Sequence, residues 1–187
     1  LVGPEMCKET GSAYIKLDDI TLHSRTHRTK VQTCGCVTVQ ANADLKGLHI
    51  ECRDLILNGK ASGDLLCSGV CKIKADQHIS GTLRARRLTV EKKTAVLVTG
   101  GVHVENAWVQ GTLEGALTAE GTVTIHRHAK FLGDITARRL VIEEGGIHQG
   151  SLTNCPDMNL PISIRGARQH NLQLFLYTSD AADDLIG

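Results

Sequence analysis

The sequence predicts an all-β protein folded as a parallel β-helix, a β-solenoid with three short strands in each turn. Three observations carry this prediction: a period of about 17 to 18 residues, aliphatic residues at three positions within it, and glycine at a fourth. The segments between the glycines are rich in Val, Ile and Thr and alternate apolar with polar residues, which is typical of strands. Because like residues recur one turn apart, we expect successive turns to pair in parallel.

The period is clearest in two segments of similar sequence. Residues 83–91 read LRARRLTVE, residues 135–143 read ITARRLVIE, and each segment follows a glycine by two residues, Gly81 or Gly133. The distance between the two segments is three such periods. They therefore predict the same strand at the same place, three turns apart.

The same period predicts the core. Aliphatic residues recur in three series, each of which we expect to form a column inside the rod, and three columns indicate three flat faces. The first series is Leu48, Leu65, Leu83, Leu117, Ile135 and Leu152, interrupted at Gly100; the second is Leu55, Ile73, Val90, Ala107, Ile125 and Ile142; the third is Ile79, Val96, Leu113, Phe131 and Ile147. Glycine recurs at Gly63, Gly81, Gly115, Gly133 and Gly150, with Val98 in the missing place, and predicts tight corners. Leu45 to Leu152 accommodates roughly six turns.

Composition fits a narrow aliphatic core, since aromatic residues make up only 3% of the chain and glycine reaches 19 residues. Lys and Arg number 21 against 20 Asp and Glu, so no global field favours nucleic acid, and we expect no nucleic-acid partner. No window approaches 18 uninterrupted apolar residues, so the sequence predicts no transmembrane helix. Seven scattered Cys residues favour reduced thiols and a cytoplasmic location.

The ends of such a rod are its predicted binding surfaces. Each turn buries its apolar face only against the turns above and below, so an uncapped end exposes aliphatic columns and unpaired backbone groups. Such an end is a template for another copy, and we expect a homopolymer formed by end-to-end stacking. The predicted contacts are Val37, Val39 and Leu45 at one end and Ile147 and Leu152 at the other.

Most cysteines are interpreted as core residues. Cys67 and Cys71 fall in columns of small or aliphatic residues, where a free Cys packs as a small hydrophobe. Cys34 and Cys52 lie one period apart, which is compatible with a disulfide or with half of a metal site as well as with packing. The sequence leaves these alternatives open.

Histidines and arginines do not predict a site. His103, His126, His128 and His148 fall at four different positions around a turn, so they do not converge on a metal ion within one subunit. The pairs at 86–87 and 138–139 have a Glu close behind each of them, which favours local ion pairs on a solvated face over a nucleic-acid site.

No nucleophile, base and orienting group recur together, and no phosphate-binding loop is present. We therefore predict no catalytic residue, no metal and no cofactor, and we do not expect an enzyme. One alternative is an acyltransferase or a zinc lyase on a left-handed β-helix, which needs an aliphatic residue at every sixth position. The unequal gaps between the observed columns do not keep that spacing. Another alternative is a solenoid binding module that stays monomeric at high concentration.

Residues 131–152, FLGDITARRLVIEEGGIHQGSL, resemble the closing turns of a bactofilin domain, and residues 79–91, ISGTLRARRLTVE, resemble its middle. The resemblance covers about Val37 to Leu152. It implies a right-handed, three-sided β-helix that forms nucleotide-independent cytoskeletal filaments in bacteria. Such filaments serve as a scaffold for cell shape or protein localisation, in the cytoplasm or associated with the membrane, where they meet cell-envelope or membrane-associated proteins.

Three regions are expected. Residues 31–153 form the β-helix, and residues 1–30 precede it as a remnant of the Cys-rich ribbon found in part of the family. Cys7 begins a segment that resembles a knuckle of that ribbon, but Thr10 stands in place of its second Cys, so we predict no metal there. Residues 154–187 form an irregular tail. Its segment 176–184, LYTSDAADD, resembles a translated sequencing adapter, and we assign it no function.

Overall fold

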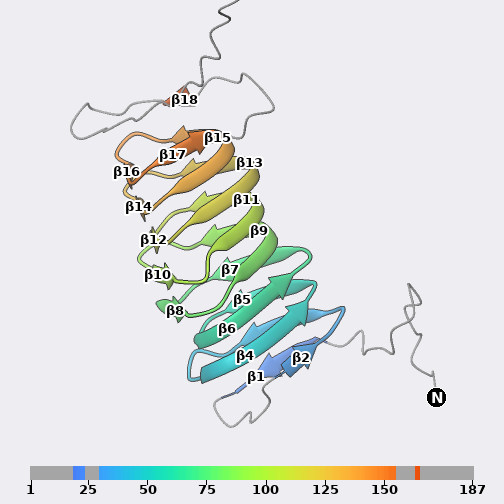
Figure 1. The fold of residues 1–187 in the computed structure, drawn as a ribbon. Helices are drawn as coiled ribbons and strands as arrows, with labels where there is room; N and C mark the ends of the chain where they lie inside the picture. The colour runs from blue at the N-terminus through green and yellow to red at the C-terminus, as the bar shows by residue number, and fades with distance from the viewer. Residues whose placement is uncertain (1–18, 24–29, 155–162, 165–187) are drawn as a thin grey trace, which may run out of the picture.

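The protein is a parallel β-solenoid, as the sequence predicts. The computed structural model describes residues 19–23, 30–154 and 163–164. Every regular element in this part of the chain is a β-strand, and the strands stack in parallel from one end of the rod to the other (Figure 1). One stack of paired residues runs through eight levels: Ile20, Val37, Leu55, Cys71, Leu88, Ala107, Val123 and Leu140. The rod therefore has about eight turns: the six predicted between Leu45 and Leu152, and further turns before Leu45.

Strands follow one another around three faces. The first face holds β1 (Ile20–Leu22), β3 (Cys36–Val39), β5 (Asp54–Leu57), β7 (Val70–Ile73) and the second halves of β9 (Leu83–Val90), β11 (Val102–Val109), β13 (Leu117–Ile125) and β15 (Ile135–Ile142). The second holds β2 (Lys30–Gln32), β4 (Asp44–Cys52), β6 (Lys60–Cys67), the first halves of those four long strands, and β17 (Leu152–Asn154). The third holds β8 (Gln77–Ile79), β10 (Ala95–Val98), β12 (Thr112–Glu114), β14 (Lys130–Leu132) and β16 (Ile147–Gln149).

Strand pairing extends outside the range 31–153 predicted for the β-helix. On one side β1 pairs with β3, and on the other β18 (Ser163–Ile164) pairs with the end of β15. The segment around Cys7 and the tail beyond residue 164 lie outside the described residues.

The pairing register corrects the first predicted column. Its members are Val31, Ile50, Leu65, Leu83, Val102, Leu117, Ile135 and Leu152. Val102 fills the place where an interruption at Gly100 was predicted. Leu48 is buried but pairs with Gly63, so Ile50 takes its predicted place beneath Leu65. The cause is uneven turn length, since the turn from Val31 to Ile50 is longer than the turn from Ile50 to Leu65.

The second column was predicted with two members out of place. It consists of Leu22, Val39, Leu57, Ile73, Val90, Val109, Ile125 and Ile142. Leu55 and Ala107, two residues earlier than Leu57 and Val109, belong to the neighbouring column with Cys71. Within each half of a long strand, alternate residues therefore point into the rod. The nine residues predicted for the core columns all lie inside the rod, with at most 3% of each exposed: Leu48, Leu65, Leu83, Leu117, Ile135, Ile73, Val90, Ile125 and Ile142.

The third column ends differently from the prediction. Val96 pairs with Leu113, Leu113 with Phe131, and Phe131 with His148. Ile147 instead pairs with Lys130, points outward and is 48% exposed. A one-residue change of register moves a strand's side chains to its opposite face, and for this reason a histidine takes the inward place predicted for Ile147.

Glycine is required where successive turns approach most closely at one corner. A Cβ atom on Gly133 would lie 2.3 Å from the carbonyl oxygen of Gly115, and φ at Gly133 is +129°. Gly150 repeats this arrangement above Gly133, with 2.1 Å to its carbonyl oxygen and a φ of +146°. Neither the space nor the backbone conformation admits another residue.

We predict that Gly133→Ala lowers the free energy of unfolding by about 3 kcal/mol, because the methyl group meets backbone that cannot move aside. Gly47→Asn is the matched control, since Gly47 has a φ of +65° and nothing within 4 Å of the position that a Cβ atom would take, and Asn tolerates that conformation. Its effect should stay within about 1 kcal/mol. Urea unfolding followed by circular dichroism measures both free energies of unfolding. Equal losses in the two variants would show that the close contact at this corner does not determine the cost of the substitution.

Candidate polymerisation interface

The two ends of the rod carry the strands that are paired on one side only. Among the described strands, β1 and β2 at one end pair only with β3 and β4, respectively. At the other end β16 pairs only with β14, and β17 only with β15 (Figure 1). Each of these edges presents backbone N–H and C=O groups in a row, which can pair with a further strand.

At the N-terminal end the predicted contacts lie one turn too deep. Val37 and Val39 are fully buried, because Ile20 and Leu22 of β1 pair directly beneath them. The end position on the first face therefore belongs to β1. The predicted boundary at residue 31 leaves this strand out of the β-helix, although Ile20 and Val37 are one period apart in the sequence.

Leu45 lies at the start of β4, where it pairs with Ala61 and is 6% exposed. No described strand pairs with Leu45 on its other side. On the second face the end position is held by Val31 of β2, which pairs with Ile50 and is also buried.

At the C-terminal end Leu152 lies as predicted, in the last turn. It pairs with Ile135 and is half-buried against the core. Ile147, the other predicted contact, lies on the outer surface beside Lys130. The inward residue of β16 is His148, and its spacing of one period from Phe131 could have identified it.

His148 continues the apolar column as the last side chain on the third face. Its ring centroid lies 5.7 Å from that of Phe131, with the two planes tilted by 47°, and its Nε2 lies 3.1 Å from the carbonyl oxygen of Gly133. Burial lowers the pKa of His148, and the hydrogen bond to Gly133 and the charge of Asp134 oppose this shift without cancelling it.

Part of this end is already occupied. β18 pairs in parallel with β15, Ser163 beside Val141 and Ile164 beside Ile142. The backbone edge of the first face is therefore covered at two residues, whereas the edges of β16 and β17 are open within the described part of the chain.

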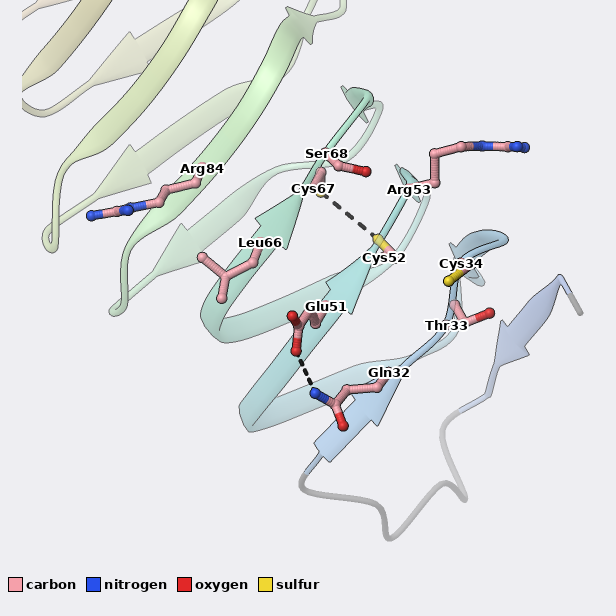
Figure 2. Close-up of a pocket in the computed structure, with 10 residues that line it drawn as sticks. All are labelled: Gln32, Thr33, Cys34, Glu51, Cys52, Arg53, Leu66, Cys67, Ser68 and Arg84. Atoms are coloured by element: carbon pink, nitrogen blue, oxygen red, sulfur yellow. Dashed lines mark hydrogen bonds between the residues drawn. The ribbon is translucent and has the colours of Figure 1, made fainter. Parts of the chain in front are cut away.

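An open groove of about 480 Å³ near the N-terminal end contains three of the cysteines, Cys34, Cys52 and Cys67 (Figure 2). Cys52 pairs in register with Cys67, and the Cys52 thiol donates a hydrogen bond to Cys67 Sγ at 3.8 Å. Thr33 continues the strand beneath Cys52, because its N–H bonds to the carbonyl oxygen of Glu51, so Cys34 is not stacked under Cys52. Both Cys34 and Cys52 are free thiols.

Hydrogen bonding to Cys67 and burial both raise the pKa of Cys52. At Cys67 the bond from Cys52 lowers the pKa, but a hydrogen bond to Cys71 and burial outweigh it, and the net pKa is raised. The two thiols are therefore protonated at neutral pH and pack as small core groups. No group of three or more His, Cys, Asp or Glu residues within the described ranges is arranged to hold a metal ion.

The charged surface contains pairs that join one turn to the next. Arg86 pairs with Glu105 at 3.5 Å, and the guanidinium of Arg87 lies 5.1 Å from the ring centroid of Trp108. Glu143 accepts hydrogen bonds from the Arg127 N–H and from His126 Nδ1, which together lower its pKa. Exposed pairs of this kind stabilise the rod only slightly, and they form no single basic stripe.

We predict that iodoacetamide modifies Cys34 at pH 8 in the native protein at least about tenfold faster than Cys52 or Cys67, because the thiolate is the reacting species and Cys34 is half-exposed. Peptide mass spectrometry gives the three rates. As a control, the three modification rates should become equal when the protein is unfolded in guanidinium chloride. Equal rates in the native protein would show that the paired thiols are not protected.

Comparison with known proteins adds one finding. The family model for bactofilin, described as polymer-forming cytoskeletal, matches residues 5–97 and 93–153, which together span more than half of the 187 residues. No curated protein and no solved structure matches the chain. A search of the described residues found no helix with the length and apolar character needed to cross a membrane.

Proposed function

The chain belongs to the bactofilin family of polymer-forming cytoskeletal proteins, and we propose that it assembles end to end into filaments without a nucleotide. These filaments serve as a scaffold for cell shape or for the localisation of other proteins. We place them in the cytoplasm, where association with the membrane brings them to cell-envelope proteins. The family description and the solenoid fold support a structural role, and we assign the chain no catalytic activity.

The observation that carries this proposal is the continuity of the apolar columns up to open strand edges. Val31 to Leu152 forms one such column without a gap, and every inner member is buried by the residue above and the residue below. At its last level Leu152 has a neighbour on one side only within the described strands. A second copy stacked on this end continues both the column and the backbone pairing.

The register defines the residues of the proposed contact. At the C-terminal end they are Leu152 and His148. At the N-terminal end the columns finish at Ile20, Leu22 and Val31, of which only Ile20 is partly exposed, so the backbone edges of β1 and β2 supply most of the contact there. Ile147 lies outside this set because its side chain points away from the rod axis. A stack over the first face also meets β18, which must leave the edge of β15 before another strand takes its place.

We predict that Leu152→Asp abolishes filaments and leaves a folded monomer, since a carboxylate at the end of an apolar column loses its hydration when a second copy stacks on it. Negative-stain electron microscopy and size-exclusion chromatography measure the outcome. Thr153→Asp is the matched control: it adds the same charge on the same strand at an exposed position paired with Thr136, and it should keep its filaments. Filaments of Leu152→Asp would show that this end is not the contact.

We predict that the double substitution Ser163→Pro and Ile164→Pro lowers the critical concentration for assembly by up to about fivefold, because it removes the N–H groups of β18 and with them one bond of about 1 kcal/mol to β15. Pelleting assays over a concentration series give the value. Ser163→Ala with Ile164→Val retains both N–H groups and should behave as the parent chain. An unchanged critical concentration in the proline variant would mean that β18 does not compete with stacking.

A further inference from the structure

His148 is the one titratable side chain in an otherwise uncharged column. Beneath it on the third face lie Phe131, Leu113, Val96 and, further down, Gln77, all of them buried. His148 is half-buried because it occupies the last turn, with Phe131 on one side and the end of the rod on the other.

The hydrogen bond at His148 fixes where a second proton goes. A carbonyl oxygen only accepts, so Nε2 carries the hydrogen that it donates to Gly133 at 3.1 Å. In the neutral ring Nδ1 then has no hydrogen. Protonation at Nδ1 creates a cation at the end of an apolar column. The nearby Phe131 ring can attract that cation, but burial outweighs the attraction, since the pKa is lowered.

The charged groups around His148 do not neutralise such a cation at the contact surface. From β14 and the turn after it come Lys130, which is exposed beside Ile147, and Asp134, which bonds to the Ser151 N–H. From the turn before β16 come Glu143, which bonds to His126, and the exposed Glu144. The described residues of β17 contribute no charge.

We propose that His148 makes end-to-end assembly sensitive to pH, with the neutral ring permitting a second copy to stack and the protonated ring opposing it. The inference rests on the proposed function, because it needs the C-terminal end to be a contact. The partner that this surface fits is a second copy of the chain, because another stacked turn continues both the apolar column that ends in His148 and the open strand edge of β16.

The direction follows from proton linkage. Stacking covers the open side of His148 and removes its remaining water, which lowers its pKa below that of the free protomer, so assembly releases a proton. Assembly is therefore complete above the pKa of the free protomer and weakens as the pH falls through it. Because one proton is released for each His148 buried, the critical concentration should rise about tenfold per pH unit in that range. The pH dependence of folding stability has the same sign: stability also falls as the pH falls, since the unfolded chain takes up this proton at higher pH than the folded protein does.

The test is the critical concentration of the full chain between pH 8 and pH 5.5, measured by pelleting and light scattering. His148→Gln is the matched variant: its Nε2 can still donate to Gly133, it carries no charge, and Gln77 shows that this column accepts a glutamine. His148→Phe provides a second uncharged variant should the first fold poorly, as judged by circular dichroism. The control is His103→Gln, which changes an exposed histidine on β11 away from both ends.

The parent chain and His103→Gln should lose assembly steeply as the pH falls through the pKa of His148 in the free protomer, which lies below the ordinary histidine value of about 6.5, whereas the two His148 variants should lose most of that slope. A parent slope retained in both His148 variants overturns the inference and leaves the proposed function intact. Failure of the parent chain to form filaments at any pH overturns the proposed function, and the inference falls with it.

Discussion

The structure depends on the in-register stacking of each turn on the next. No turn has a core of its own: Leu83, for example, is fully buried because Leu65 and Val102 pair with it from either side. At roughly 25 cal/mol for each Å² of apolar surface removed from water, such columns contribute most of the favourable free energy of a fold with few aromatic residues. The same dependence leaves strand edges unpaired at the first and last described turns, so that stability and the proposed assembly have one physical origin.

Turns of unequal length still stack their inward residues in regular columns. The turn from Val31 to Ile50 is longer than the one from Ile50 to Leu65, yet the inward residues remain stacked, because the extra residues lie in loops and in a register shift within β4, between Leu45 and Leu48. Polar side chains secure these places: Asp54 Oδ1 accepts the Val70 N–H at 2.8 Å, and Asn106 Oδ1 accepts the Thr122 N–H at 3.0 Å at a corner higher in the rod. Many residues that resemble functional groups in the sequence therefore join neighbouring turns, as do Arg86 with Glu105 and Cys52 with Cys67.

What distinguishes the ends is how each column finishes. Leu152 ends one column with an aliphatic group, His148 ends another with an ionisable ring, and β18 covers the backbone edge beside a third. An aliphatic end favours stacking at every pH. An ionisable end makes stacking depend on pH, and an edge that is already paired makes stacking compete with that pairing. In the filament that we propose, assembly is controlled at these places without a nucleotide, because a small free energy at the contact acts at every junction along the filament.

The sequence by itself determined the fold class, the family and most of the core, since a regular period and an alternation of apolar and polar positions are properties of the chain that survive small errors of alignment. Leu65, Leu83, Leu117 and Ile135 stack as the period predicted. Only the tertiary structure decided which residues reach the ends. A mean period cannot follow turns of unequal length, and in a strand a shift of one residue reverses the side chain's direction, which is why Ile147 lies outside and His148 within. The place of β1 beneath Val37 and the pairing of β18 with β15 were decided in the same way, by contacts between segments. The single spacing of one period between Ile20 and Val37 is too little pattern to predict a strand by itself.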